Sequence, residues 1–561
     1  MLAVLPDQRR IGLPTGCYIR EVPGPDGNSA SPPLPFWRMV GLHGRFFLLV
    51  TLAAFALRLI FYFRFPHVTG DSLVYGDIAK NWLDTGIFGL THSDGVHPTW
   101  IRLPGYPAFL AACFVLFGRE HYHAVLLVQI VVDVASCFFI ADLARRTVSE
   151  RAAQIAFLLA ALCPFTANYT VAPLAETLSI FFVAIALDAA AAGLNAIDEN
   201  SRPQVRVLPL DANHEDSVPQ VRVLPLDANL GSQARHIWLA WTICGLAVSC
   251  GILLRPDGGI LLIAVGLYLL WRIWRAAITV SGSHSGRAGL QAAGKGTFDA
   301  ALKRRSTQRA PLFWAGTLVL AIAVAPLVPW TIRNWRDFRV FQPLVPQSAS
   351  DPDEFVPDGF DKWAKTWSAD YVSTEEVYWE VPGDKVDLSL LPSRAFDSAD
   401  ERQRTQAIFN DYSNVLVINP ELNARLMDLA NERIRRNPLR YYVWLPALRI
   451  ADMWLRPRTE MLPLNSRWWE YSDDTKDCVI ATLWGLLNLL FIFAAVMGVV
   501  RGPHPRYLGM MLLFVALRSA FLGTLANPEP RYTLECYPVV LLLGAAWISG
   551  WRTRAHVRQQ E

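Results

Sequence analysis

Long apolar runs alternate with polar segments along the chain, and their lengths predict a series of membrane-spanning helices. An apolar helix of about 18 residues or more can cross roughly 30 Å of hydrocarbon. One further run, Leu103–Gly118, is shorter and opens on Pro-Gly-Tyr-Pro, so it fits a re-entrant or interfacial helix as well as a span. About ten spans are expected, at 44–65, 123–144, 152–168, 171–193, 236–254, 258–275, 312–331, 478–500, 507–525 and 533–550.

Basic residues decide the topology. With ten spans, the basic clusters fall on one side of the membrane, whereas an eleventh span would separate the first cluster from the others. Cytoplasmic loops carry this excess of Lys and Arg, so both termini are expected inside. The predicted fold class is an all-α polytopic membrane protein. The clusters are Arg9/Arg10, Arg145/Arg146/Arg151, Arg272/Arg275, Leu302–Arg309, Arg501/Arg506 and Arg552/Arg554/Arg558.

The polar segments divide the chain into domains. A perfect duplication, "PQVRVLPLDAN" at Pro203–Asn213 and Pro219–Asn229, has too few copies for a repeat fold and indicates an insertion in a flexible linker. In the extracytoplasmic segment, 439–455 has the pattern of an interfacial helix and 423–437 that of another helix. The expected parts are a disordered cytoplasmic tail (1–43), an N-terminal transmembrane module (44–331) with outer loop 66–122 and cytoplasmic linkers 195–235 and 276–311, an extracytoplasmic segment (332–477), C-terminal transmembrane helices (478–550) and a second tail (551–561).

Composition agrees with a membrane protein and excludes several classes. Hydrophobic residues make up 52% of the 561 positions and charged residues 18%, against about 25% in soluble proteins. The eight cysteines are scattered without a CxxC pair, which argues against disulfides or zinc. The first residues lack the order of a signal peptide. Neither GxGxxG nor GxxxxGK[ST] occurs, which argues against an ATP-driven pump or a nucleotide-sugar enzyme.

Charged residues collect at one predicted membrane face, the outer one. Charges near a bilayer are costly unless paired or hydrated, so their convergence predicts a functional site. Each residue also has a structural interpretation: an arginine can anchor the interface, Glu176 can stabilise a helix N-terminus, and Asp71 can cap one. Asp133 and Asp188 lie deeper in spans, where pairing with bundle neighbours can account for them, and they are not assigned to the site. The outer-face set is Asp71, Asp77, Arg102, Glu176, Arg255, Asp257, Arg333, Glu529 and Arg531.

This set suits a lipid-linked phosphate. Guanidinium groups bind phosphate oxygens in a forked geometry, and a nearby carboxylate can take a proton from an attacking hydroxyl or amine. Since no nucleotide sugar is expected outside the membrane, an activated sugar would arrive on a polyprenyl phosphate. The chemistry requires no metal and no other cofactor. His92, Asp94 and His97 form a weak candidate metal site.

Several motifs together resemble a known family. Asp71, Tyr75, Asp77 and Lys80, with "TGIFG" and "RLPGYP", resemble the first outer loop of GT-C glycosyltransferases, in particular protein O-mannosyltransferases and lipid A aminoarabinose transferases. The motifs "PLAETL", "LLRPDG", "PWTIRNW" and "EPRYTLECYP" follow in the family's order. The resemblance covers most of 44–550 and is weakest over 340–475.

The resemblance implies an inverting transfer from a polyprenyl-phosphate sugar at the outer leaflet to a glycan, lipid or protein acceptor. Asp71 inherits the role of catalytic base. Ser72 and Arg102 depart from residues common in the family, so the family's acceptors are not carried over. The residues implied to bind substrate or lipid phosphate are Arg102, Arg255, Arg531, Tyr75, Asp77, Lys80, Tyr106, Glu176 and Arg333.

Two other functions remain open at this point. A transporter or flippase would use the same charges along a substrate path, but such proteins are often built from internal repeats, which the two halves of this chain lack. A non-catalytic scaffold leaves the convergent charges without a role. The basic loops fit a bacterial inner membrane, and the pattern is also compatible with the endoplasmic reticulum.

Overall fold

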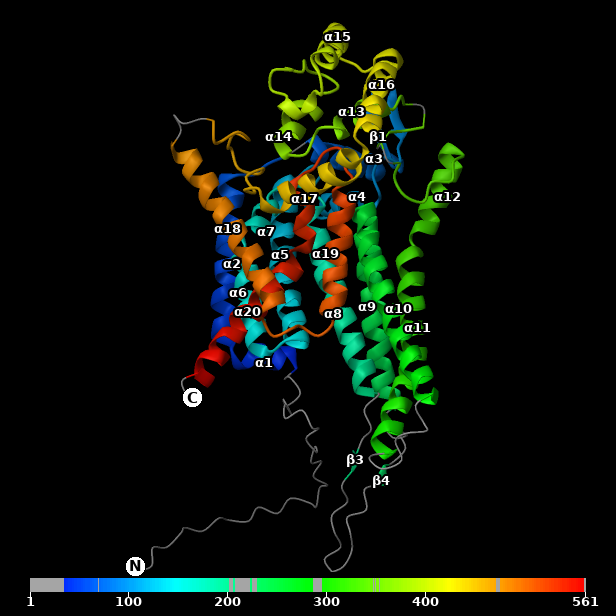
Figure 1. The fold of residues 1–561 in the computed structure, drawn as a ribbon, viewed down its shortest axis with the longest axis vertical. Coiled ribbons are helices and arrows are strands. Elements are labelled where there is room, and N and C mark those ends of the chain that lie inside the picture. Colours follow the sequence, from blue (N-terminus) through cyan, green and yellow to red (C-terminus); the bar gives the residue numbers. More distant parts are fainter. Residues whose placement is uncertain are drawn as a thin grey trace, which may run out of the picture.

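A bundle of long apolar helices forms the body of the protein (Figure 1). Eight of the described helical segments, three of them made of two consecutive helices, are long and apolar enough to cross a membrane. They are α2 (Gly44–Arg64), α5 (Tyr122–Thr147), α8 (Glu176–Asn200), α9 (Leu230–Leu254), η1 (Pro256–Gly258) with α10 (Gly259–Ser285), α11 (Lys295–Val324) with α12 (Leu327–Phe338), α18 (Thr475–Val500), and η5 (Pro530–Cys536) with α20 (Tyr537–Arg558). The computed structural model describes residues 35–68, 70–200, 205–206, 222–223, 230–285, 295–346, 348, 350–352, 354–470 and 475–558.

The two other predicted spans are built differently. The run 152–168 is divided into α6 (Glu150–Ala161) and α7 (Pro164–Tyr169), because Pro164 cannot continue the preceding helix. The run 507–525 contains the shorter helix α19 (Leu508–Leu522), and the ambiguous run 103–118 forms α4 (Gly105–Phe117). The predicted all-α polytopic fold is confirmed.

Small residues allow the central helices to approach closely. The face of α8 that meets α5 and α9 carries alanines and Gly193, as is common where helices pack in membranes. A Cβ at Gly193 would lie 2.6 Å from the indole ring of Trp241 on α9, so this contact requires glycine. Trp241 itself is fully buried. The centre of the bundle is therefore tightly packed.

The first outer loop folds into a compact unit beside these helix ends. It consists of α3 (Gly70–Thr85), a hairpin of β1 (Gly89–His92) and β2 (Gly95–Pro98), and α4. The carboxylate of Asp77 accepts hydrogen bonds from the amide (2.7 Å) and hydroxyl (2.9 Å) of Thr91, which fixes the hairpin against α3. A Cβ at Gly105 would lie 2.5 Å from the Leu253 carbonyl oxygen, so α4 packs directly on the backbone of α9.

The outer helical segment lies at one end of the bundle (Figure 1). It has its own hydrophobic core around Trp363, Trp367, Phe409 and Leu426. Ser398 caps α15 and Asn419 caps α16, each accepting a hydrogen bond from a backbone amide of the first turn. The elements are α13 (Asp358–Lys365), α14 (Tyr371–Ser373), η2 (Thr374–Tyr378), η3 (Ser393–Ala395), α15 (Ala399–Val415), α16 (Pro420–Arg436), η4 (Arg440–Trp444) and α17 (Leu445–Leu455).

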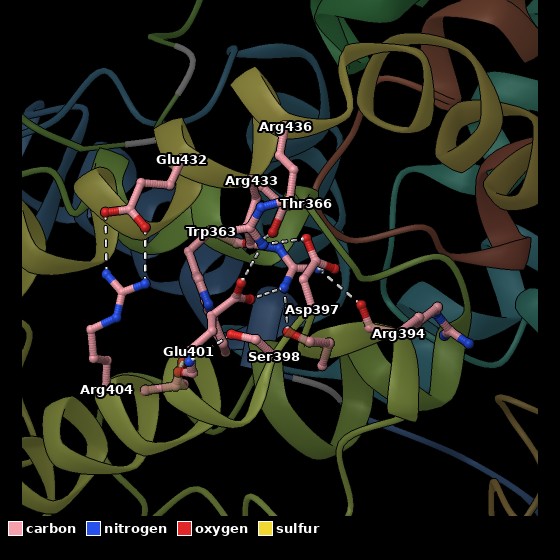
Figure 2. A network of polar contacts seen from close by, with 12 residues as sticks. Trp363, Thr366, Arg394, Asp397, Ser398, Glu401, Arg404, Glu432, Arg433 and Arg436 are labelled. Carbon is pink, nitrogen blue, oxygen red and sulfur yellow. Dashed lines mark hydrogen bonds and ion pairs between the residues drawn. The ribbon is translucent and has the colours of Figure 1, made fainter.

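A buried polar network holds α15 and α16 together (Figure 2). Arg433 is buried and pairs with Glu401, and it also donates to the carbonyl of Ala395 at 2.7 Å. Arg436 reaches the second oxygen of Glu401 at 3.0 Å. Because each charge in this network has a partner, its burial does not leave an unpaired ion.

Arg449 connects this outer segment to the membrane helices. It is buried on α17 and donates to the carbonyls of Ser368 (2.9 Å), Lys365 (2.6 Å) and Gly523 (3.2 Å), the last of which follows α19. The outer segment is thereby held over the end of the bundle where α3 and α4 lie.

Parts of the predicted tails and linkers are among the residues that the structure describes. A short helix, α1 (Phe36–Leu42), lies within the predicted tail 1–43, and strands β3 (Val205–Arg206) and β4 (Arg222–Val223) pair the two copies of the duplication. The rest of the duplication, residues 1–34 and 286–294, and the last residues of the second tail lie outside the described residues. The predictions of a disordered tail and of flexible linkers fall there.

Candidate active site

Six segments that are distant in the sequence surround one cavity of about 1160 Å³ at the outer end of the bundle. They are the start of α3, the residues before α4, the α7–α8 turn, the α9–η1 turn, the α19–η5 turn and the outer segment. The lining combines three arginines with carboxylates and tyrosines. The charged members are Arg102, Arg255, Arg531, Asp71, Glu176, Asp257, Glu375, Glu460 and Glu529.

Asp71 lies in the first turn of α3 and binds two of the arginines. Arg102 Nη2 donates to Asp71 Oδ1 at 2.9 Å, and Arg531 Nη2 donates to Oδ2 at 3.4 Å. Burial raises the pKa of Asp71, but the positive charges of Arg531 and Arg102 outweigh burial and hold the pKa below its ordinary value. Asp71 is therefore an ionised carboxylate at neutral pH in the empty cavity.

Arg255 lies at the sharp turn between α9 and η1. A Cβ at Gly258 would lie 2.5 Å from the Gly251 carbonyl, so the "RPDG" turn closes tightly on the end of α9. The Arg255 guanidinium donates to Glu176 at 3.0 Å and to Asp257 at 3.2 Å. Burial lowers the pKa of Arg255, yet the carboxylates of Asp257 and Glu176 hold it well above its ordinary value. This side chain remains a cation.

Arg531 joins the two charged groups of the cavity. Its Nε lies 2.6 Å from Glu529 and 3.6 Å from Glu176, while its Nη2 contacts Asp71. The rings of Tyr532 and Tyr75 add cation–π contacts, with Arg255 4.7 Å from the Tyr532 ring centre and Arg102 5.5 Å from that of Tyr75. The three guanidiniums are thus positioned by carboxylates and aromatic faces together.

The structure brings six of the predicted site residues to this cavity and places the other four outside its lining. Asp71, Tyr75, Arg102, Glu176, Arg255 and Arg531 line it; Asp77, Lys80, Tyr106 and Arg333 do not.

Each of the four outside the lining has a structural contact. Asp77 fixes the hairpin, and Lys80 pairs with Glu120 at 3.1 Å. Tyr106 is buried behind Tyr75, with their ring centres 4.9 Å apart. Arg333 donates to the Thr99 and Phe88 carbonyls, both at 2.7 Å.

The candidate metal site on the hairpin is an exposed pair. His97 Nε2 lies 2.9 Å from Asp94, and the His92 ring packs against that of His97. Among the residues that the structure describes, no group of three or more His, Cys, Asp or Glu side chains is arranged to hold a metal ion.

No sequence pattern singles out the cavity residues that come from the outer segment. Tyr371, Glu375, Trp379 and Glu460 line the cavity, together with Tyr169 at the end of α7. One signal was present: Glu460 lies in "RPRTEMLPL", a carboxylate next to apolar residues shortly before a span. Without the fold, nothing in that pattern distinguishes it from the other acidic residues of 332–477.

Comparison with known proteins gives a family match over part of the chain and likenesses to several solved structures. Residues 96–202 match the family model described as dolichyl-phosphate-mannose-protein mannosyltransferase. Among curated proteins, no sequence matches the chain.

Several solved structures align with most of the chain, and they include the following two. The oligosaccharyltransferase AglB of Archaeoglobus fulgidus, in complex with an inhibitory peptide and a dolichol-phosphate, aligns with 93% of this chain and 52% of its own at 12% identity and a TM-score of 0.47. ArnT of Cupriavidus metallidurans, bound to undecaprenyl phosphate, aligns with 92% of this chain and 79% of its own at 13% identity and a TM-score of 0.32. The chain spans about half the length of the archaeal protein.

The matched segment contains "RLPGYP" and "PLAETL", two of the motifs on which the predicted resemblance rests. Residues 96–202 of the chain are thus similar to the family described as dolichyl-phosphate-mannose-protein mannosyltransferase, and the predicted resemblance is confirmed over that segment.

Proposed function

We propose that this protein is an integral membrane glycosyltransferase that moves a sugar from a polyprenyl-phosphate donor to an acceptor on the extracytoplasmic side. One observation carries the proposal: Asp71, which can act as a base, lies in the same cavity as three guanidinium groups, within hydrogen-bond distance of two of them. Phosphate binding and proton removal can therefore take place side by side. The dolichol-phosphate and undecaprenyl phosphate in the AglB and ArnT structures are in keeping with a donor of this kind.

The contacts of Asp71 give the order of events. An entering donor phosphate competes with the Asp71 carboxylate for Arg102 and Arg531, since both are anions that a guanidinium binds in a fork. Once the phosphate occupies these contacts, its negative charge offsets the two guanidinium charges that lower the pKa of Asp71. The pKa of Asp71 then rises, and Asp71 becomes a better base. Donor binding then prepares the base, which favours donor before acceptor.

The transfer is a single displacement. Asp71 accepts the proton of the acceptor hydroxyl or amine while the acceptor atom forms a bond to the anomeric carbon of the sugar. The bond between that carbon and the phosphate oxygen breaks, and its electron pair leaves on the polyprenyl phosphate. Arg102, Arg255 and Arg531 stabilise the charge that develops there. Attack from the face opposite the leaving group inverts the anomeric centre.

We place the cavity outside the cell membrane, facing the extracytoplasmic side of a bacterial inner membrane. Arg145 and Arg146 lie in the last turn of α5, and Arg272 on α10 pairs with Asp198 near the end of α8. The ends of α5 and α8 lie away from the outer segment (Figure 1). Cytoplasmic loops carry such an excess of basic residues.

Turnover of synthetic donors tests the function. The purified full-length protein, in lipid nanodiscs, is incubated with radiolabelled undecaprenyl-phosphate sugars and acceptor-containing membranes, and release of undecaprenyl phosphate is measured. We expect release by the wild type and by Asp84→Asn, a matched change on an exposed carboxylate of α3 that pairs with Arg119. Asp71→Asn should lose about 10²–10⁴-fold in rate. Binding without release by the wild type, over the whole panel, would instead indicate a transporter.

A further inference from the structure

One group in the cavity has no role in the mechanism above. Glu460 lies in the turn after α17 and lines the cavity. The residue as a whole is half-buried, but both carboxylate oxygens are buried, and neither receives a hydrogen bond from another residue within the described part of the chain. Buried polar atoms without partners are rare in native proteins, and such a group calls for a partner.

The neighbouring arginines do not supply a hydrogen-bond donor to the Glu460 carboxylate. Arg458 donates to the Pro530 carbonyl at 2.7 Å and to the side chain of Asn488 at 3.2 Å. Arg456 donates to the Ser466 carbonyl at 2.7 Å. Burial raises the pKa of Glu460 to about 6, and the charge of Arg458 opposes this shift. At neutral pH, Glu460 is therefore an ionised hydrogen-bond acceptor. Neither of these two guanidiniums donates a hydrogen bond to it.

Glu460 is accompanied by a second buried group of the same kind. The hydroxyl of Tyr169 also lines the cavity, is buried, and has no hydrogen-bond partner among the described residues. The two groups are close enough to interact electrostatically. Tyr371 and Trp379, whose ring centres are 5.7 Å apart, add aromatic surface to the same cavity.

The chemistry of this part of the lining differs from that of the arginines. A carboxylate accepts hydrogen bonds, a phenol both donates and accepts them, and aromatic rings offer flat apolar faces. Glu375 adds a further carboxylate, which disfavours an anionic phosphate here, whereas Glu529 is paired with Arg531. A neutral ring with several hydroxyl groups satisfies all of these features.

We propose that Glu460 and Tyr169 bind hydroxyl groups of a sugar ring and so determine which sugar-bearing substrate is used. This inference rests on the proposed function and assigns to these two residues a task different from that of the phosphate-binding arginines, of which Arg531 is near enough to Tyr169 to interact with it electrostatically. The ring belongs either to the donor or to a glycan acceptor, and both present the same hydroxyl chemistry.

Binding and turnover by the full-length protein in nanodiscs test the proposal. The probes are undecaprenyl phosphate and an undecaprenyl-phosphate sugar that the wild type uses. If the donor sugar is bound, Glu460→Gln should raise the half-saturating concentration of the sugar-bearing lipid about 10-fold, as expected for loss of a hydrogen bond to a charged group, and leave binding of undecaprenyl phosphate within about two-fold. If the acceptor glycan is bound, the KM of the acceptor rises instead.

Three comparisons make the result decisive. Glu470→Gln, an exposed carboxylate that pairs with Arg467 outside the cavity lining, should change nothing. Tyr169→Phe should reproduce the selective loss in a side chain of nearly the same shape. At pH 8 the empty Glu460→Gln protein should melt at least as high as the wild type, whereas a purely structural Glu460 would give a lower Tm.

The two hypotheses fail in different ways. Equal weakening of bare and sugar-bearing lipid, or no change for donor and acceptor alike, would overturn the role of Glu460 while leaving the glycosyltransferase intact. A wild type that neither binds undecaprenyl phosphate nor turns over any donor would overturn the proposed function, and this inference with it.

Discussion

The contacts of Asp71 predict that one substitution has opposite effects on binding and on rate. In the empty cavity this carboxylate competes with phosphate for Arg102 and Arg531. Asp71→Asn removes that competitor but keeps the shape of the side chain. We therefore expect the variant to bind undecaprenyl phosphate more tightly than the wild type while its turnover is lost.

The size of the gain follows from the two contacts. A hydrogen bond to a charged group contributes about 1.5–3 kcal/mol, and solvent lowers this value for an exposed group. The Asp71 side chain is 37% exposed, the contact to Arg531 is long at 3.4 Å, and Arg531 keeps Glu529 as a partner. We expect a net gain of about 1 kcal/mol, or roughly five-fold tighter binding.

Equilibrium binding of radiolabelled undecaprenyl phosphate to nanodiscs measures the effect, with Asp84→Asn as the control. The difference in affinity between Asp71→Asn and the wild type should be present at pH 7 and should shrink in acid. Protonation of wild-type Asp71 then removes the same negative charge that the substitution removes. Its lowered pKa puts that titration below the ordinary range of an aspartate. Weaker binding by Asp71→Asn would refute the competition between carboxylate and phosphate and, with it, the proposed order of substrates.

Three further outcomes are expected. Arg102→Ala should raise the half-saturating concentration of the donor lipid about 10–100-fold through loss of a charged hydrogen bond and leave the KM of the acceptor unchanged; equal loss for both would argue against a phosphate contact. In the empty protein, Glu460 should contribute a fall in stability of about 2 kcal/mol as pH rises from about 4.5 to about 6, because ionising Glu460 costs more in the folded state than in the unfolded one, and Glu460→Gln should lessen the fall seen in a thermal melt by that amount. Gly105→Ala should destabilise the protein by about 1–3 kcal/mol because its Cβ would lie 2.5 Å from the Leu253 carbonyl, whereas Gly266→Ala, where nothing lies within 4 Å, should be neutral in the same melt.

The sequence predicts the membrane part of the fold well because hydrocarbon thickness dictates the length of apolar runs. The exceptions have local causes. Pro164 divides one predicted span into α6 and α7, and the run after Arg506 forms only the short helix α19. Such breaks depend on how neighbouring helices satisfy the freed backbone groups, which a single segment does not reveal.

The sequence predicts those residues of the candidate site that are charged and lie beside an apolar run, at the edge of the membrane. Asp71, Arg102, Arg255 and Arg531 stand out as charges beside apolar runs, and they do share a cavity. Arg333 has the same sequence pattern, but its guanidinium binds backbone carbonyls outside the lining. Position along the chain does not fix the direction of a long side chain.

The cavity residues of the outer segment could not be predicted from the sequence for another reason. Glu460, Tyr371 and Trp379 come to the cavity only because the outer segment has its own core and is held over the bundle by the contacts of Arg449. These contacts join residues far apart in sequence, and no local pattern in 332–477 encodes them.

The pairing of each cavity arginine with a carboxylate has a consequence for soluble phosphates. An anion that enters must displace an internal partner, so a small phosphate in the surrounding fluid gains little from contact with Arg102, Arg255 or Arg531. A phosphate attached to a long hydrocarbon chain brings additional free energy from burial of that chain, which offsets the displacement. The internal ion pairs would thus act as an affinity threshold that admits lipid-borne phosphates and leaves free ones in solution.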